Sequence, residues 1–453
     1  MYDTIIVGAG LAGLQAATTL SAAGKNIVVL EARDRVGGRV ENIALKDGRI
    51  VEMGGQWVSP GHEKMHALID AQGLQTVEPG GGDMVLRLGG KAKKIHVEQP
   101  AAQDNLSPFE FSDLGQALLR LRRLARKVTD NPTWAAANDR WLGQSLQQWQ
   151  DVNLRTEGGR RYFARLVEKA LGIHPEITTL EDALQRVSTG VDLESYVVTS
   201  GGVRQARVVG GLAQLTDEMA RGLGDRIHLS TPVTRVEHAE GHVIVTCEGG
   251  DRFEGSSLVL TAPPRLLKTI DFEPDLPAER YDMADKIPAG NVIKAFLVYD
   301  EPWWRDRGLS GQMSWNEGAM RITFDTSDDE HHGILLGFFE GGEASGYGKL
   351  SVSLRQRIFE EAIERAFGPA PRKPVDYVDR DWLAEKYTQG CHAAHFAPGL
   401  WTAAGPVIGQ PLGSMYFAGA EYASTFNGYM EGAVRSADAA TSAILDVAKS
   451  SEH

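Results

Sequence analysis

A glycine-rich turn near the amino terminus constrains this chain more than any other feature. An apolar strand, a helix and a second apolar strand are predicted in succession, over residues 3–8, 11–23 and 26–30. Gly8, Gly10 and Gly13 stand at the first strand-to-helix turn in the order G-x-G-x-x-G. The first glycine permits the tight turn, the second lets the backbone approach a pyrophosphate, and the third lets the helix pack closely on the strand. Glu31 follows the second strand, where a carboxylate accepts a hydrogen bond from a ribose hydroxyl. The sequence therefore predicts a dinucleotide-binding βαβ unit.

Length, charge and cysteine content limit the class of protein. A chain of 453 residues predicts two or three domains. The formal net charge of -13 argues against a nucleic-acid binder, which needs an excess of Lys and Arg. Two cysteines, Cys247 and Cys391, cannot form a disulfide framework. Because we find neither a signal segment nor an apolar run long enough to cross a membrane, we expect a soluble, cytoplasmic protein without a membrane anchor.

Three further patterns describe the organisation of the chain. Residues 107–130 are predicted to form an amphipathic helix that starts with a capping box. Residues 226–264 predict a β-meander, with strands expected over 228–236, 243–247 and 258–262. Two more helices are expected over 356–367 and 428–448. We find no internal repeat and no low-complexity linker, so the domains are expected to be interleaved along the sequence.

Several motifs beyond the βαβ unit occur in the order and approximate spacing of one enzyme family. A glycine pair followed by arginine, Gly37-Gly38-Arg39, comes just after the second strand. The other motifs lie at residues 52–58, 208–211, 231–233, 261–264, 291–294, 301–303, 382, 387–391, 416–421 and 427–433. With them the chain resembles the flavin-dependent amine oxidases, and more narrowly the monoamine oxidase family, nearly from end to end.

The resemblance implies an α/β fold in which a Rossmann-like FAD-binding domain is interleaved with an α+β substrate domain. The FAD-binding domain is expected to comprise residues 1–77, 208–284 and 385–453. The substrate-binding domain is expected to comprise residues 78–207 and 285–384.

The same resemblance implies an activity. In this family a hydride moves from the carbon beside the amine nitrogen to flavin N5, and water hydrolyses the resulting imine to an aldehyde or ketone. O2 then reoxidises the flavin and yields hydrogen peroxide. FAD is therefore the implied cofactor, and a small-molecule amine and O2 are the implied partners. We expect no metal site, because the histidines lack ligand spacing, and a homodimer is left open.

Three residues are implied as catalytic. Lys294 lies in an apolar strand, where an isolated ammonium is costly unless it reaches solvent or has a task. In the family this lysine holds a water against flavin N5 and assists the reaction with O2. Tyr429 matches one wall of the aromatic cage that flanks the amine. His392 stands where the second wall is commonly tyrosine, and its imidazole is smaller and more polar.

The resemblance further implies a set of cofactor-binding residues. Cys391 matches the position whose thiolate forms a thioether bond to the flavin 8α carbon; a small buried residue is the alternative interpretation. The final helix would direct its positive amino-terminal end towards the reduced flavin. The complete set is Gly8, Gly10, Gly13, Glu31, Arg33, Gly38, Arg39, Gly54, Gly55, Gln56, Trp57, Val233, Trp382, Cys391, Gly419, Glu421, Tyr429 and Met430.

The substrate pocket is less well specified. Its predicted lining residues are Leu171, Ile173, Tyr196 and Val198, for which ordinary core packing is the alternative. Mammalian members of the family carry a glutamine where this chain has Val203, so one polar anchor is missing here.

The main interpretation is an oxidase of a primary or simple secondary amine, and several alternatives stay open. A diamine or polyamine oxidase of the putrescine type needs a carboxylate deep in the pocket, for which Asp192, Glu194 and Glu317 are candidates. A cyclic secondary amine is another possible substrate. An L-amino-acid oxidase usually carries an arginine where residues 54–57 offer none. A non-catalytic flavin scaffold predicts loss of the lysine or of the aromatic wall, and both are present.

Overall fold

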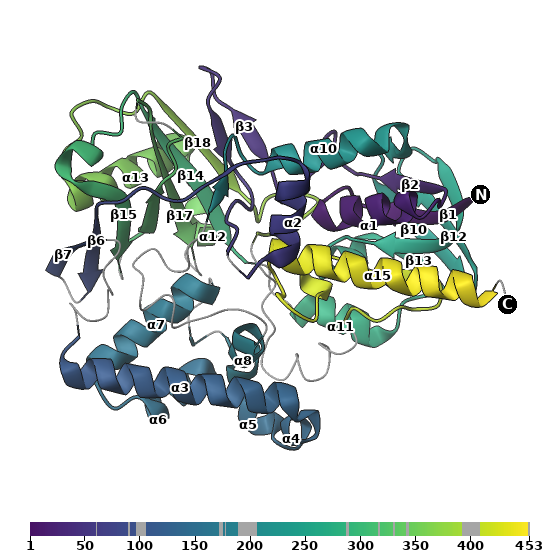
Figure 1. The fold of residues 1–453 in the computed structure, drawn as a ribbon, viewed down its shortest axis with the longest axis horizontal. Coiled ribbons are helices and arrows are strands. Elements are labelled where there is room, and N and C mark those ends of the chain that lie inside the picture. The colour runs from purple at the N-terminus through teal and green to yellow at the C-terminus, as the bar shows by residue number, and fades with distance from the viewer. Residues whose placement is uncertain are drawn as a thin grey trace.

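The computed structural model describes residues 1–59, 61–88, 91–96, 106–171, 175–176, 178–188, 206–286, 290–315, 318–328, 331–340, 344–391 and 408–451. Two large β-sheets lie at opposite ends of the molecule, and a group of helices packs below them in the view of Figure 1.

The first sheet contains the predicted βαβ unit. β1 (Tyr2–Val7) and β2 (Ile27–Leu30) pair in parallel, and α1 (Leu11–Ala22) connects them. Across the sheet the strands run in the order β13 (Asp271–Glu273), β10 (Val233–Ala239), β11 (His242–Cys247), β12 (Arg252–Leu260), β1, β2 and β9 (Ile227–His228), and β19 (Met415–Phe417) also pairs with β12. Because β1 and β2 are parallel, their carboxyl ends bring the glycine turn and Glu31 to the same edge.

The prediction of one strand over 228–236 is wrong. β9 ends at His228, and β10 starts at Val233 on the far side of β1 and β12. Between them Ser230 adopts a φ of 52°, and Pro232 has no N–H to donate to a neighbouring strand. This break moves the chain from one edge of the sheet to the meander.

Both faces of the first sheet are covered, which explains the uninterrupted apolar sequence of its central strands. On one face, Ile6 packs with α1, α2 (Glu63–Ala71), α10 (Ala213–Leu223) and α15 (Met430–Ser451). On the other face, Ile5 and Val7 pack with residues of η2 (Pro264–Thr269) and with Tyr281 of α11 (Ala278–Lys286). α15 runs alongside α1 (Figure 1), so the carboxyl-terminal helix completes the layer that the amino terminus begins. Shorter 3-10 turns are η1 (Gly224–Arg226) and η4 (Ala420–Tyr422).

The second sheet is built around a fully buried central strand. In order its strands are β18 (Asp376–Asp381), β14 (Val292–Tyr299), β17 (Gly333–Glu340), β16 (Met320–Asp325), β15 (Leu309–Trp315), β6 (Asp83–Leu88) and β7 (Lys91–His96). All eight residues of β14 are buried, Lys294 among them. η3 (Arg305–Arg307) and α12 (Ala344–Gly348) lie between strands of this sheet in the sequence.

The two faces of the second sheet pack against different parts of the chain. α13 (Val352–Phe367) covers one face. It begins four residues before the predicted start because the Ser351 hydroxyl accepts a hydrogen bond from the Leu354 N–H. The other face packs against the hairpin of β3 (Asn42–Ala44) and β4 (Ile50–Glu52), through Val51 of β4 and the neighbouring Leu45 and Met53. This second contact connects the sheet to the segment that contains Gly54.

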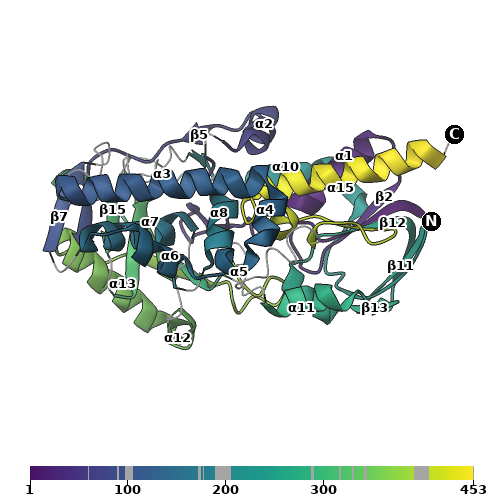
Figure 2. The same cartoon turned by 90° about the horizontal axis from the view of Figure 1, so that it is seen from below.

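The third unit is helical and includes the predicted amphipathic helix. α3 (Pro108–Asp130) carries the expected capping box between Ser107 and Glu110. Its apolar face packs with neighbouring helices, and α3 extends along much of the molecule (Figure 2). The other helices are α4 (Pro132–Ala137), α5 (Asp139–Leu142), α6 (Leu146–Asn153), α7 (Glu157–Leu171) and α8 (Leu180–Ser188), and the short strands β5 (Thr76–Val77) and β8 (Arg207–Val208) pair with each other.

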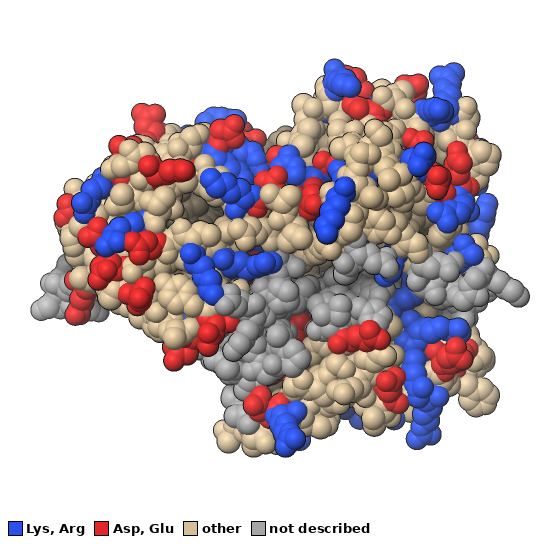
Figure 3. Space-filling model, turned by 180° about the vertical axis from the view of Figure 1, so that it is seen from behind, with Lys and Arg blue, Asp and Glu red and all other residues tan. Residues whose placement is uncertain are grey.

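The surface carries both signs of charge. Acidic and basic side chains are mixed over most of the face opposite to Figure 1 (Figure 3). None of the helices within the described ranges is both long and apolar enough to cross a lipid bilayer.

Candidate cofactor and substrate site

One cavity of about 430 Å³ collects residues from both sheets and from the start of α15. Most of the residues implied by the resemblance line it, although they come from distant parts of the sequence. They are Gly8, Gly10, Glu31, Arg33, Gly38, Arg39, Gly54, Gly55, Gln56, Trp57, Val233, Lys294, Cys391, Gly419, Tyr429 and Met430.

Glycine backbone forms one wall of this cavity at the start of α1. Gly8 has a φ of 101°, and a Cβ there would lie 2.3 Å from Thr261 Oγ1. Gly10 and Gly38 face each other so closely that a Cβ on Gly38 would lie 3.2 Å from Gly10 Cα. Gly13 is outside the lining, where a Cβ would lie 1.9 Å from the Gly8 carbonyl oxygen. The turn therefore exposes backbone N–H groups at a helix amino terminus, where anions bind.

Glu31 fixes the shape of the turn. Its carboxylate is 4% exposed and accepts hydrogen bonds from the Ala9 N–H at 2.7 Å and the Arg33 N–H at 2.9 Å. Glu31 thus ties the end of β2 to the glycine turn and still borders the cavity.

A bidentate ion pair holds an arginine at the cavity wall. Arg39 donates to the buried Glu421 carboxylate at 2.5 and 2.8 Å, so Glu421 supports the site from behind its lining. Burial alone would lower the pKa of Arg39, but the charge and hydrogen bonds of Glu421 raise it overall. The guanidinium therefore stays charged beside the cavity.

The segment 54–57 lines the cavity, and the residue before it is held from behind. Trp382 is fully buried and donates from Nε1 to the Met53 carbonyl oxygen at 2.9 Å, which places it outside the lining. A Cβ on Gly54 would lie 2.0 Å from a backbone oxygen, so the close chain approach requires glycine. The Gln56 Nε2 group is buried and has no hydrogen-bond partner among the described residues.

Lys294 reaches this same segment from the second sheet. Its Nζ donates to the Gly54 carbonyl oxygen at 2.8 Å and to Gln56 Oε1. The side chain is 3% exposed, so it does not snorkel to solvent. Burial lowers the pKa of Lys294 to about 7, against the opposing charge of Glu52. Both protonation states of this amine are therefore accessible near neutral pH.

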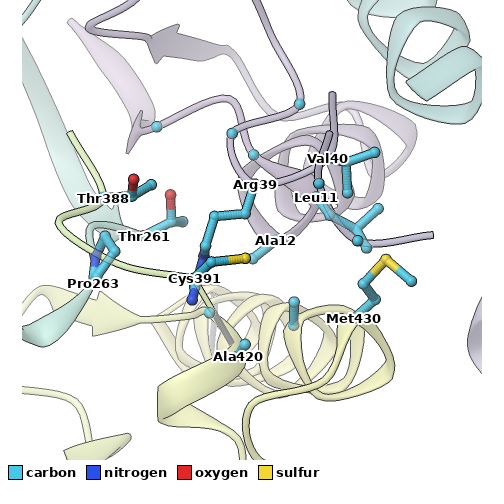
Figure 4. A pocket seen from close by; sticks show the side chains of 18 of the residues that line it. Leu11, Ala12, Arg39, Val40, Thr261, Pro263, Thr388, Cys391, Ala420 and Met430 are labelled. Carbon is cyan, nitrogen blue, oxygen red and sulfur yellow. The ribbon is translucent and has the colours of Figure 1, made fainter. Parts of the chain in front are cut away.

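Cys391 lies at the cavity wall beside Arg39 (Figure 4). Its N–H donates to the Gly290 carbonyl oxygen at 3.1 Å, and it is partly exposed. Burial is the largest single contribution to the pKa values of Arg39 and Lys294, and it acts to lower both. A negative charge on Cys391 acts in the opposite direction on both groups. An ionised Cys391 would therefore attract Arg39 and the protonated form of Lys294. Cys247 is buried in β11, away from the lining.

Tyr429 stands directly before α15 and contacts two further rings. Its side chain packs against the helical unit, and its ring centroid lies 5.8 Å from that of His62 in an edge-on arrangement. His62 in turn lies edge-on to Phe426 at 5.5 Å. Both His62 and Tyr429 line the cavity, and we call this part of its wall the aromatic end.

Several residues of the lining were not predicted from the sequence. An apolar wall from β16 and β17 consists of Ile322, Phe324 and Phe338. The ring centroids of Phe324 and Trp57 lie 5.6 Å apart. Phe338 pairs with Lys294 across neighbouring strands, so both side chains lie on the same face of the sheet. The signal for these residues is strand register, which a single sequence does not provide. His62 carried no signal that we could separate from an ordinary histidine.

Some predicted site residues lie outside the described residues. They are His392, Ile173, Tyr196 and Val198, together with the side chain of Leu171. Among the residues that are described, no group of three or more His, Cys, Asp and Glu side chains is arranged to hold a metal ion.

The residues present fit FAD. The glycine wall and Arg39 suit a pyrophosphate, since they combine a helix amino terminus with a positive charge. Gln56 Nε2 and Thr388 Oγ1 are buried polar atoms of the lining that find no partner in the described chain. A buried polar atom without a partner is costly, and the flavin ring offers carbonyl and nitrogen groups that would supply one.

Comparison with known proteins gives consistent results. Over residues 11–445 the chain matches the family described as flavin containing amine oxidoreductase. Flavin-containing amine oxidase A of Equus caballus is 29% identical over 453 residues, covering 98% of this chain and 85% of that protein.

Solved structures agree as well. A putrescine oxidase, in an alanine-to-cysteine variant made to redesign cofactor binding, has a TM-score of 0.90 at 29% identity, with 98% of this chain and 99% of that chain covered. Cyclohexylamine oxidase from Brevibacterium oxydans has a TM-score of 0.89 at 28% identity, with 99% of each chain covered. The chain therefore belongs to the flavin-containing amine oxidoreductase family, and it is a flavin amine oxidase.

Proposed function

We propose that the cavity binds FAD and oxidises an apolar primary or simple secondary amine in front of it. The observation that carries this proposal is the convergence of a glycine-lined helix start, a buried lysine and an aromatic end in one cavity. When bound, FAD accepts a hydride from the carbon beside the amine nitrogen and passes the electrons to O2, which becomes hydrogen peroxide.

Different residues of the cavity would contact different parts of the cofactor. Gly8, Gly10 and Gly38 would face the pyrophosphate with Arg39 nearby, and Glu31 would face the ribose. Gln56 and the start of α15 would face the flavin ring, where a helix amino terminus stabilises negative charge.

We also propose a thioether bond between Cys391 Sγ and the flavin 8α carbon. Its position at the wall and the positive charge of Arg39 beside it support this bond. Net formation removes one hydrogen from the thiol and one from the flavin methyl group, and O2 accepts the two electrons and two protons. The engineered cysteine in putrescine oxidase supports a role for cysteine in cofactor binding in this family.

The remaining chemistry would fall to two side chains. Tyr429 presents a ring at the aromatic end, where it would orient the amine and exclude water. Lys294 lines the cavity and would place its ammonium where negative charge develops on O2.

The lining favours a monoamine over a diamine. Trp57, Phe324, Phe338 and Ile322 make the wall near Lys294 apolar. Within the described lining the one carboxylate is Glu31, which accepts from the Ala9 and Arg33 N–H groups and would face the ribose of FAD. A distal ammonium therefore finds no free carboxylate there. Asp192, Glu194 and Glu317, the sequence candidates for a diamine site, lie outside the described residues.

The domain division predicted from the sequence is consistent with the two large sheets. Every strand of the first sheet falls within 1–77, 208–284 or 385–453, and every strand of the second falls within 78–207 or 285–384. We propose these limits for the FAD-binding and substrate-binding domains. The cytoplasmic location and the homodimer stay predictions.

A direct test is the formation of peroxide in air with benzylamine, cyclohexylamine, putrescine and an L-amino acid as separate substrates. We expect peroxide and one equivalent of aldehyde or ketone with benzylamine or cyclohexylamine. Turnover of putrescine alone would overturn the monoamine proposal, and turnover of the amino acid alone would overturn the substrate class. The variant Tyr429→Ala should lose most of the activity but retain the flavin spectrum.

A further inference from the structure

A buried histidine at the aromatic end of the cavity has a fixed hydrogen-bonding role. His62 directly precedes α2, is 5% exposed and lines the cavity beside Tyr429. We propose that His62 is a specificity residue whose imidazole can only donate towards the cavity, so that the site binds an amine in its neutral form and rejects the ammonium. This inference rests on the proposed function of the cavity.

The position of His62 is determined by its surroundings. The Glu431 carboxylate of α15 accepts hydrogen bonds from the Lys64 and Met65 N–H groups, at 3.1 and 2.9 Å, and so anchors the first turn of α2. The imidazole ring then lies edge-on between Phe426 and Tyr429. Because α15 carries the anchor and directly follows Tyr429, the two rings keep a fixed relation.

The backbone selects the tautomer of His62. The Ser59 N–H lies 3.2 Å from His62 Nδ1, and an N–H group can only donate. Nδ1 must therefore be the acceptor, which leaves the ring proton on Nε2. Among the described residues no hydrogen bond to Nε2 is found, and His62 lines the cavity, so the Nε2–H would donate to a ligand there.

The charged groups around His62 do not convert its imidazole into the doubly protonated cation. Burial lowers the pKa of His62 to about 4; Glu431 opposes this effect, whereas His66 and Arg435 add to it. Protonation would also place a second N–H against the Ser59 N–H. The ring therefore stays neutral across the physiological range.

A donor-only group distinguishes the two forms of an amine. A neutral amine has a lone pair that accepts the Nε2 hydrogen bond, whereas an ammonium has only hydrogens to present. The neutral amine is also the form that can lose a hydride, so the site would favour the reactive species over the form that dominates in solution.

The first experiment measures the tautomer and the protonation state of the His62 imidazole. The holoenzyme is labelled with 15N-histidine, and the His62 signals are assigned by their loss in His62→Phe. We expect a neutral Nε2–H tautomer from pH 6 to pH 9. A proton on Nδ1, or titration near the ordinary histidine pKa, would overturn the inference.

The second experiment follows anaerobic reduction of the flavin by benzylamine across the same pH range. The variant His62→Gln keeps an N–H donor and adds an amide oxygen that accepts from an ammonium. In this variant we expect the pKa of the bound amine, read from the rate constant of flavin reduction at saturating benzylamine, to rise towards its solution value. His66→Gln is the matched control, because His66 also bonds Ser59, at its carbonyl oxygen, but does not line the cavity.

The outcomes separate the two proposals. An active His62→Gln enzyme with the wild-type pH profile would overturn the role of His62 alone. A wild-type enzyme with bound FAD that no amine reduces would overturn the proposed function, and the inference with it.

Discussion

Replacing Gly10 by alanine should weaken cofactor binding without unfolding the protein. Gly10 has a φ of -74°, which alanine adopts without strain, and the added Cβ would lie 3.8 Å from the nearest protein atom, Gly38 Cα. Alanine lowers the conformational entropy of the unfolded chain, which stabilises the folded protein by about 0.4–1 kcal/mol. Alanine is also a poorer helix cap than glycine, which destabilises the protein by a similar amount. We therefore expect the free energy of unfolding to change by less than about 1 kcal/mol.

The cofactor should respond much more strongly to the same methyl group. If the pyrophosphate contacts the Gly10 backbone, the methyl overpacks that contact by about 1–3 kcal/mol, which is roughly a 5- to 150-fold loss of FAD affinity. The assays are urea unfolding of the apoprotein and fluorescence titration with FAD, both in a Cys391→Ala background that keeps the cofactor exchangeable.

Gly13→Ala is the contrasting control for this prediction. Its Cβ would lie 1.9 Å from the Gly8 carbonyl oxygen, inside the protein, so it should destabilise the fold by about 3 kcal/mol or more. If Gly10→Ala binds FAD as tightly as its parent, the glycine wall does not hold the pyrophosphate.

Three further predictions address other parts of the site. Lys294→Met should slow reoxidation by O2 roughly 100-fold and flavin reduction far less; in the wild type, reoxidation should slow as pH rises through about 7, where the ammonium loses its proton. Equal reoxidation rates of Lys294→Met and the wild type in stopped flow would contradict this role of Lys294. Glu421→Gln should cost about 3 kcal/mol in urea unfolding, because it leaves the Arg39 charge without its buried partner. Acid precipitation should release flavin from Cys391→Ala but not from Cys247→Ala, and release from both, or from the wild type, would exclude the thioether bond.

Local signals predicted those parts of the fold that depend on neighbours in the sequence. The glycine turn and its flanking strands were predictable because apolar runs and glycine spacing act within one βαβ unit. The helix α3 was predictable because Ser107 and Glu110 form its capping box within a single turn. The apolar strand around Lys294 was predictable, whereas the sequence left open whether its side chain reaches solvent.

Features that depend on distant contacts could not be predicted. Phe338 faces the cavity because β17 pairs with β14 in one register, and a shift by one residue would turn its side chain to the other face. His62 reaches the site because Glu431, far along the chain, anchors α2. The break between β9 and β10 depended on the backbone conformation of Ser230, which no apolar pattern reveals.

The most direct test of the central claim is anaerobic mixing of the purified protein with an amine while flavin absorbance is recorded. We predict that benzylamine or cyclohexylamine bleaches the flavin rapidly, and that admission of air restores the absorbance with one equivalent of peroxide. Bound FAD that none of the amine classes reduces would contradict the account.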